Sequence, residues 1–174
     1  MSRQPAEIGV NPALYFRCLA FYNLEAELLD TNRVAEWLGL IDPEIDYRIP
    51  IRITRERSAG LGFSESGYHM TGTYRTLQAR VERFESEYAW GDDPPSRTRR
   101  FVSNLRVRPG KDDRLEVKSN LLVYRGRFDM PNHQLISAER DDTLVQSVEG
   151  LRLVRRVVLL DHSTLATGSL GILL

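Results

Sequence analysis

Three histidines and one cysteine are the side chains of this sequence that most readily bind a metal or act as nucleophiles. His69, His133 and His162 are far apart and fall in different predicted elements. An iron site of two histidines and a carboxylate needs these groups on one side of the metal, and nothing in their spacing predicts it. Cys18 lies on the apolar stripe of a predicted helix, where a thiol acts as a small hydrophobic group. One thiol cannot build a zinc site or an iron–sulfur cluster, so we expect no catalytic residue, metal or cofactor in this chain.

An acid–base site is the enzyme alternative. Asp46, Tyr47 and Tyr124, with a histidine, could line the pocket of a small α+β cone and act as dehydratases and isomerases do. Tyrosines at alternate strand positions fit a core role as well. The sequence has no G-x-S-x-G motif, phosphate loop or dinucleotide fingerprint. A stand-alone dehydratase or isomerase, or a small-molecule-binding protein, is therefore the alternative function.

An arginine-rich strand that begins at Arg100 is predicted after Pro94-Pro95. Its residues alternate, so we expect one face, with Phe101, Leu105 and Val107, to be buried. The other face carries arginines, which pair well with carboxylates at protein interfaces. It is predicted to meet another subunit, although the solvated face of a surface sheet explains the pattern equally well. The predicted interface residues are Arg97, Arg99, Arg100, Asn104 and Arg106.

The elements that must position these residues divide into helices first and strands later. Apolar residues at a spacing of three to four predict helices, and period-two alternation predicts strands. The position between Phe21 and Leu28 on the first helix is filled by Leu24 or Glu25. The predicted helices are 11–30, 32–38 and 73–88, the predicted strands are 45–53, 100–108, 115–125, 134–148 and 151–161, and 55–72 is predicted to be a loop. Helices on one side of an antiparallel sheet define the α+β class.

Composition and charge limit the partners. The 174 residues suit one domain, with residues 1–11 as an N-terminal arm and 12–174 as the α+β body. The formal net charge is zero, which argues against nucleic acid as a partner. No apolar run approaches the ~20 residues that span a bilayer, and no signal peptide is found. We expect a cytoplasmic protein whose apolar end, 170–174, docks on the body.

Three stretches together resemble a known family. The first runs from Trp90 and an acidic pair through Pro-Pro-Ser-Arg-Thr-Arg-Arg-Phe-Val-Ser to Asn104, and the others span Glu139–Leu144 and Arg155–Asp161. In their order and spacing they are similar to the small (beta) subunit of bacterial aromatic-ring-hydroxylating dioxygenases. The chain departs from that pattern at Gly150, near which the family often has a tryptophan, and in its tail. These departures leave the substrate subgroup open.

The resemblance implies a cone-shaped fold of the cystatin-like, nuclear-transport-factor-like kind, with N-terminal helices packed on a strongly curved, mostly antiparallel sheet. It implies a non-catalytic subunit that holds an oxygenase together in aromatic compound catabolism. The partners would be a large (alpha) subunit and other copies of the chain, three alpha with three beta. The Rieske iron–sulfur cluster and the mononuclear iron would lie on the alpha subunit, so the aromatic substrate cannot be read from this chain.

Overall fold

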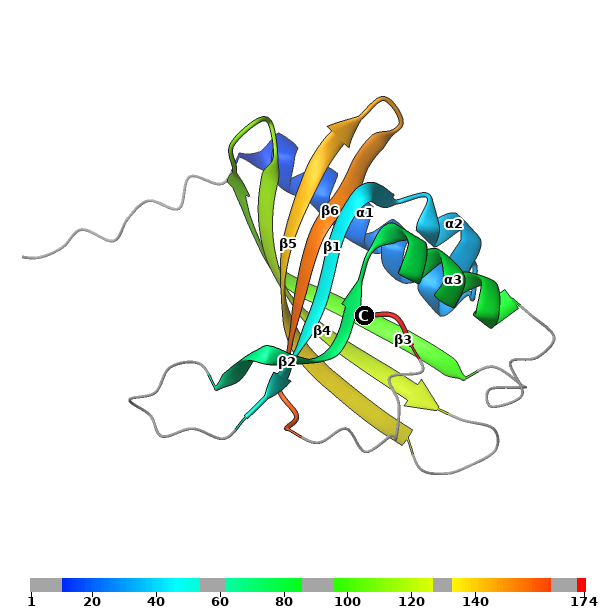
Figure 1. The fold of residues 1–174 in the computed structure, drawn as a ribbon. Helices are drawn as coiled ribbons and strands as arrows, with labels where there is room; N and C mark the ends of the chain where they lie inside the picture. The colour runs from blue at the N-terminus through cyan, green and yellow to red at the C-terminus, as the bar shows by residue number, and fades with distance from the viewer. Residues whose placement is uncertain (1–10, 54–61, 86–95, 127–132, 164–171) are drawn as a thin grey trace, which may run out of the picture.

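The structure, a computed structural model, describes residues 11–53, 62–85, 96–126, 133–163 and 172–174. Two helices come first along the chain, the third helix follows strands β1 and β2, and the remaining strands come last (Figure 1). The helices are α1 (Pro12–Asp30), α2 (Val34–Leu38) and α3 (Tyr74–Glu85). The strands are β1 (Ile41–Arg52), β2 (Phe63–Gly72), β3 (Arg97–Pro109), β4 (Leu115–Gly126), β5 (His133–Ser147) and β6 (Gly150–Leu160).

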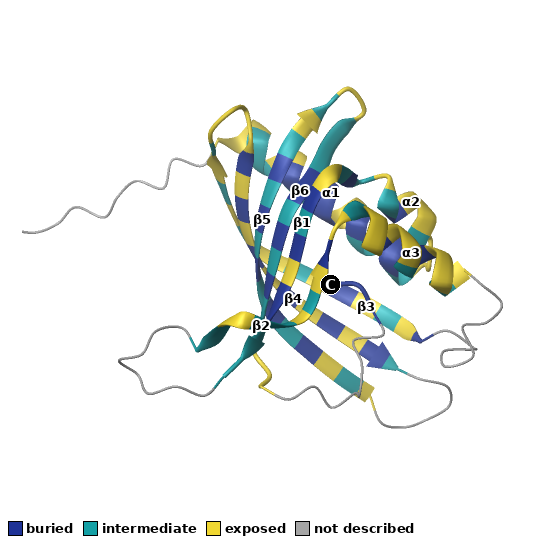
Figure 2. Ribbon diagram, in the orientation of Figure 1, coloured by how far each residue is buried: buried dark blue, intermediate teal, exposed yellow. Residues whose placement is uncertain are grey.

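The described strands form one curved sheet in the order β2-β1-β6-β5-β4-β3. Neighbouring strands are antiparallel, except that β1 and β6, far apart in the sequence, pair in parallel. The helices lie on one side of the sheet, which bends around them (Figure 1). Buried and exposed residues alternate along β4, as expected for a strand with one face on a core (Figure 2). The predicted α+β class and the mostly antiparallel curved sheet are confirmed.

Local sequence signals place the helix starts. The side chain of Asn11 accepts a hydrogen bond from the Leu14 amide at 3.3 Å, and Pro12 takes the first helical position. Thr73 precedes α3, where its amide donates to Oγ1 of Thr76 at 2.8 Å. Both predicted helix starts are confirmed, and Cys18 lies on the buried stripe of α1 as predicted.

The predicted loop between residues 55 and 72 is wrong in its second half, because Phe63–Gly72 is strand β2. This strand pairs with β1 through its backbone, and its side chains do not alternate between buried and exposed. The pairing is interrupted at Pro50, where the register shifts. A glycine- and serine-rich edge strand without a buried face therefore carries no periodic signal in its sequence.

The face assignment on β3 is wrong for Phe101 and right for Leu105 and Val107. Phe101 is 55% exposed, whereas Leu105 and Val107 pack against the core. One extra residue enters β3 between Ser103 and Arg106, where the register with β4 shifts. Such a β-bulge exchanges the two faces of a strand. Even-numbered residues therefore face inward before the bulge and odd-numbered residues after it.

We expect the stability of this bulge to depend on the residue at position 104. Asn104 has a φ of 54°, in the left-handed region that asparagine tolerates and β-branched residues avoid. Asn104→Val should lower the free energy of unfolding by about 1–2 kcal/mol, while Asn104→Gly should stay within about 0.5 kcal/mol of the parent. Urea denaturation of both variants measures the difference. Equal effects of the two substitutions would contradict the assignment.

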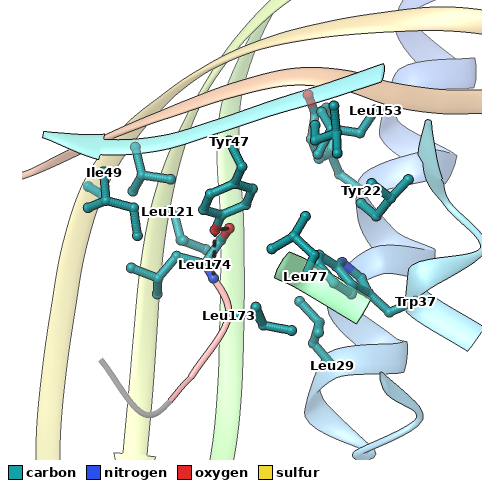
Figure 3. Packing of buried hydrophobic residues seen from close by; sticks show 14 of the residues in the cluster. Tyr22, Leu29, Trp37, Tyr47, Ile49, Leu77, Leu121, Leu153, Leu173 and Leu174 are labelled. Carbon is teal, nitrogen blue, oxygen red and sulfur yellow. Dashed lines mark hydrogen bonds between the residues drawn. The ribbon is translucent and has the colours of Figure 1, made fainter. Parts of the chain in front are cut away.

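The core fills the space between the helices and the sheet. Trp37, Tyr47 and Leu77 are fully buried there. Leu173 and Leu174 point into the same cluster from the C-terminal segment (Figure 3). Docking of the apolar end is thus confirmed for residues 172–174, while 170 and 171 lie outside the described residues.

Candidate functional site

The inside of the sheet carries a network of buried charges rather than an apolar surface alone. Arg156 on β6 has no solvent exposure. Its Nε and Nη2 donate to the two carboxylate oxygens of Asp142 on β5, at 3.0 and 2.8 Å. Its Nη1 and Nη2 also donate to the carboxylate of Glu25 on α1, at 2.6 and 3.1 Å. Arg156 therefore joins the first helix to the two central strands.

A second arginine and two neutral groups complete the network. Arg140 on β5 donates from Nη1 to Glu25 at 2.9 Å, and its guanidinium lies 4.9 Å from the centre of the Tyr22 ring. The Tyr22 hydroxyl donates to Asp142 at 2.9 Å, and Nε1 of Trp37 donates to Glu25 at 3.3 Å. Both carboxylates thus receive charged and neutral donors, which is what buried carboxylates need to stay ionised.

These contacts set the protonation states. Burial acts to raise the pKa of Glu25, but Arg156 and then Arg140 outweigh it, and the pKa falls to about 2. Burial acts to lower the pKa of Arg156, yet Asp142 and Glu25 hold it well above its usual value. Burial, and then Asp142, raise the pKa of Tyr22, so its hydroxyl stays protonated. A carboxylate with so low a pKa is a poor proton acceptor, so this network suits a structural role.

The buried network was not predicted from the sequence, because arginines are expected on the outer face of a sheet. Of Leu24 and Glu25, the two candidates for the inward position between Phe21 and Leu28 on α1, Glu25 is buried and Leu24 is exposed. The available signal was the pairing of Asp142 with Arg156, which are direct cross-strand neighbours on β5 and β6. Apart from Arg140, their inward faces carry apolar residues such as Leu144 and Val158. Opposite charges at inward positions of adjacent strands indicate a buried ion pair.

The proposed acid–base constellation is not assembled. Tyr47 is buried, but the preceding Asp46 points to the other face and pairs with Arg48 at 2.7 Å. Tyr124 lies on the outside of β4, stacked on His133 with ring centres 5.2 Å apart. Alternation along a strand sends neighbouring residues to opposite faces, so these groups cannot share one pocket.

The three histidines are placed on the surface. His69, His133 and His162 are all exposed. Within the residues that the structure describes, no three histidine, cysteine, aspartate or glutamate side chains gather closely enough to hold a metal ion. Cys18 is buried, and burial raises the pKa of its thiol to about 11, so the reactive thiolate is disfavoured. In that described part, no helix is long and apolar enough to cross a membrane.

The five predicted interface residues do not share one environment. Arg97, Arg99, Asn104 and Arg106 are exposed. Arg100 is only 8% exposed, and its placement on the outer face is wrong. Its Nη1 lies 2.5 Å from Oδ1 of Asp30, at the end of α1, and its main-chain amide donates to Oδ2 at 2.8 Å. The bulge is the reason, because it lies between Arg100 and the second half of the strand.

Apolar side chains gather on the outer face of β3, β4 and β5. Phe101 is the cross-strand neighbour of Leu122, and Tyr124 is the cross-strand neighbour of Leu135. All four are exposed, and we call them the outer patch. Arg99 lies at its border, as the cross-strand neighbour of Tyr124. A contiguous group of large exposed apolar side chains is typical of an interaction surface.

Comparisons with known proteins agree with this fold. The family described as "Ring hydroxylating beta subunit" matches residues 24–167. The beta subunit of chlorobenzene dioxygenase from Cupriavidus sp. (strain PS12) is 34% identical over 175 residues, covering 97% of this chain and 92% of that protein. The beta subunit of biphenyl 2,3-dioxygenase from Rhodococcus jostii (strain RHA1) is 32% identical over 168 residues, covering 93% and 89%.

A solved structure shows the same fold. Naphthalene 1,2-dioxygenase with indole bound in its active site contains a chain that matches with a TM-score of 0.85 and 24% identity, covering 95% of this chain and 88% of the other. Dioxygenase beta subunits are parts of oxidoreductase complexes that act in the degradation of aromatic hydrocarbons. This chain belongs to the family of ring-hydroxylating dioxygenase beta subunits.

Proposed function

We propose that this chain is the non-catalytic beta subunit of a multicomponent aromatic-ring-hydroxylating dioxygenase and holds the oxygenase together. Its partners are a large alpha subunit and further copies of itself, three of each. The Rieske cluster and the mononuclear iron belong to the alpha subunit. The observation that carries this proposal is the arrangement of the two faces: a charge-balanced network fills the inside, and the apolar outer patch faces outward.

The outer patch supports contact through the face of the sheet. At Arg100, the outward amide of edge strand β3 is already bonded to Asp30, so a new strand cannot pair there. Arg99, beside the patch, has neither a hydrogen bond nor an ion pair in the part of the chain that the structure describes. Arg106 instead donates to Glu139 at 2.9 Å. Of these exposed arginines, Arg99 is therefore the one available to a partner's carboxylate.

Phe101→Asp should separate assembly from folding. Because Phe101 is exposed, Phe101→Ala should change the free energy of unfolding by less than about 0.5 kcal/mol. A charge at the centre of an apolar contact is strongly unfavourable, so Phe101→Asp should weaken binding of the large subunit about tenfold or more. Co-expression with the large subunit, followed by sedimentation of the complex, measures this.

Matched variants test the specificity of that result. Arg99→Glu should weaken assembly more than Arg106→Glu, because among the described residues Arg106 is paired with Glu139 and Arg99 has no such partner. Phe16→Asp is the control for an exposed phenylalanine elsewhere, since Phe16 lies on α1. A Phe101→Asp chain that assembles like the parent would refute the role of the outer patch.

A further inference from the structure

The last three described residues occupy a built site inside the curved sheet. Ile172, Leu173 and Leu174 are all buried. Nη2 of Arg100 donates to the main-chain oxygen of Leu173 at 2.6 Å, and Nη1 of Arg156 donates to that of Leu174 at 3.0 Å. The Tyr47 hydroxyl also donates to the Leu174 oxygen and accepts from the Leu174 amide at 3.2 Å (Figure 3).

The donors come from three strands, and the two arginines among them are held in place without the segment. Tyr47 lies on β1, Arg100 on β3 and Arg156 on β6. Asp30 fixes one end of the Arg100 guanidinium, and Glu25 and Asp142 fix Arg156. The two guanidinium groups of the site are therefore positioned by contacts that do not involve residues 172–174.

The arginines and carboxylates around the site balance in charge, and some guanidinium N–H groups remain available to donate to main-chain oxygens. Three guanidinium groups, of Arg100, Arg140 and Arg156, face three carboxylates, of Glu25, Asp30 and Asp142. Besides these pairs, Nη2 of Arg100 donates to the Leu173 oxygen and Nη1 of Arg156 to the Leu174 oxygen, while the buried Nε of Arg100 and Nη2 of Arg140 have no hydrogen-bond partner among the described residues. Buried donors without an acceptor are costly, so the site needs an occupant.

The rest of the site is apolar. Leu173 and Leu174 point into the cluster that contains Leu77 and Trp37 (Figure 3). Such a site recognises a short extended peptide by its main-chain oxygens and selects apolar side chains by the surrounding core.

We propose that the space inside the curved sheet next to Tyr47, Arg100 and Arg156 is a binding site for an apolar peptide segment. Ile172–Leu174 occupies this site as the chain's own ligand. The segment joins β1, β3 and β6 through one set of hydrogen bonds. The site is separate from the outer patch, so this inference does not depend on how the subunits assemble. Emptied of its own segment, the site should accept the same peptide from solution.

The test uses a chain that ends at residue 171 and the peptide acetyl-Gly-Ile-Leu-Leu, as the free acid and as the amide. The peptide should raise the thermal midpoint of the shortened chain in a saturable manner and leave that of the full chain unchanged. Tyr47→Phe in the shortened chain should lower peptide affinity about tenfold, because two hydrogen bonds are lost. Binding of both peptide forms shows recognition of a carbonyl, and binding of the acid alone shows recognition of a carboxylate; both support the site.

A control peptide and a second variant keep the test decisive. Acetyl-Gly-Ile-Asp-Leu should not bind, because the Leu173 side chain is buried in an apolar cluster. If the shortened chain does not fold alone, the full-length variant Leu173→Asp replaces it, since its own segment should be displaced from the site. It should then respond to acetyl-Gly-Ile-Leu-Leu as described. Absence of a saturable response in the chain that folds, or equal binding of the control peptide, overturns the proposal.

Discussion

Arg156→Leu is expected to lower the free energy of unfolding by about 3–5 kcal/mol, the usual cost of removing one member of a buried ion network. Among the described residues, the substitution leaves the carboxylate of Asp142 with only the Tyr22 hydroxyl as a donor. It also deprives Glu25 of two of its three arginine hydrogen bonds, those at 2.6 and 3.1 Å. The separation of two buried charges from their partner is far more costly than the leucine side chain can offset by packing. For a chain of this size the thermal midpoint should fall by on the order of 10 °C. Urea denaturation and thermal melting followed by circular dichroism measure both quantities.

Arg155→Leu is the matched control, one position earlier on the same strand. Arg155 lies on the outer face, where its side chain is 43% exposed and 3.5 Å from Asp141. Pairs of this kind contribute about 0–1 kcal/mol, so this variant should unfold nearly like the parent. Similar losses for the two variants would mean that the buried network does not set the stability of the fold.

Stability should also fall in acid, between about pH 4.5 and pH 2. The pKa of Glu25 is about 2 in the folded chain and about 4.5 when the carboxyl is free of the network. A lowered pKa stabilises the fold fully above the unfolded pKa, and this contribution is lost as the pH drops through the folded pKa. One pKa unit corresponds to about 1.4 kcal/mol, so the loss should be about 3 kcal/mol. Urea denaturation at several pH values from 2 to 7 gives the curve.

The variant Glu25→Gln distinguishes the contribution of this carboxyl to acid unfolding from the contributions of all other carboxyls. The variant should be less stable at pH 7, because Arg140 and Arg156 lose a shared counter-charge. Its stability should then decline less steeply than that of the parent below pH 4.5, since one proton-linked group has been removed. Glu27→Gln is the control, because Glu27 lies exposed on the same helix. An unchanged acid slope in Glu25→Gln would show that other carboxyls control acid unfolding.

The sequence by itself determined the features that depend on neighbours along the chain. Asn11 and Pro12 start the first helix because capping and the fixed φ of proline act locally. The turn after Pro109 and the strands β4 and β6 follow from turn residues and from side chains that alternate with period two. The order of helices and strands then gave the α+β class, and the resemblance of several stretches gave the family.

Only the tertiary structure decided which side of a strand faces the core. The bulge at Asn104 exchanged the faces of β3, so Arg100 entered the interior and Phe101 remained outside. A period-two pattern cannot show such a shift, because one inserted residue leaves the residue types unchanged. The buried position of Arg156 likewise depends on Glu25, 131 residues earlier in the chain. An arginine lies in a protein interior only where distant carboxylates meet it, and the fold alone brings them together.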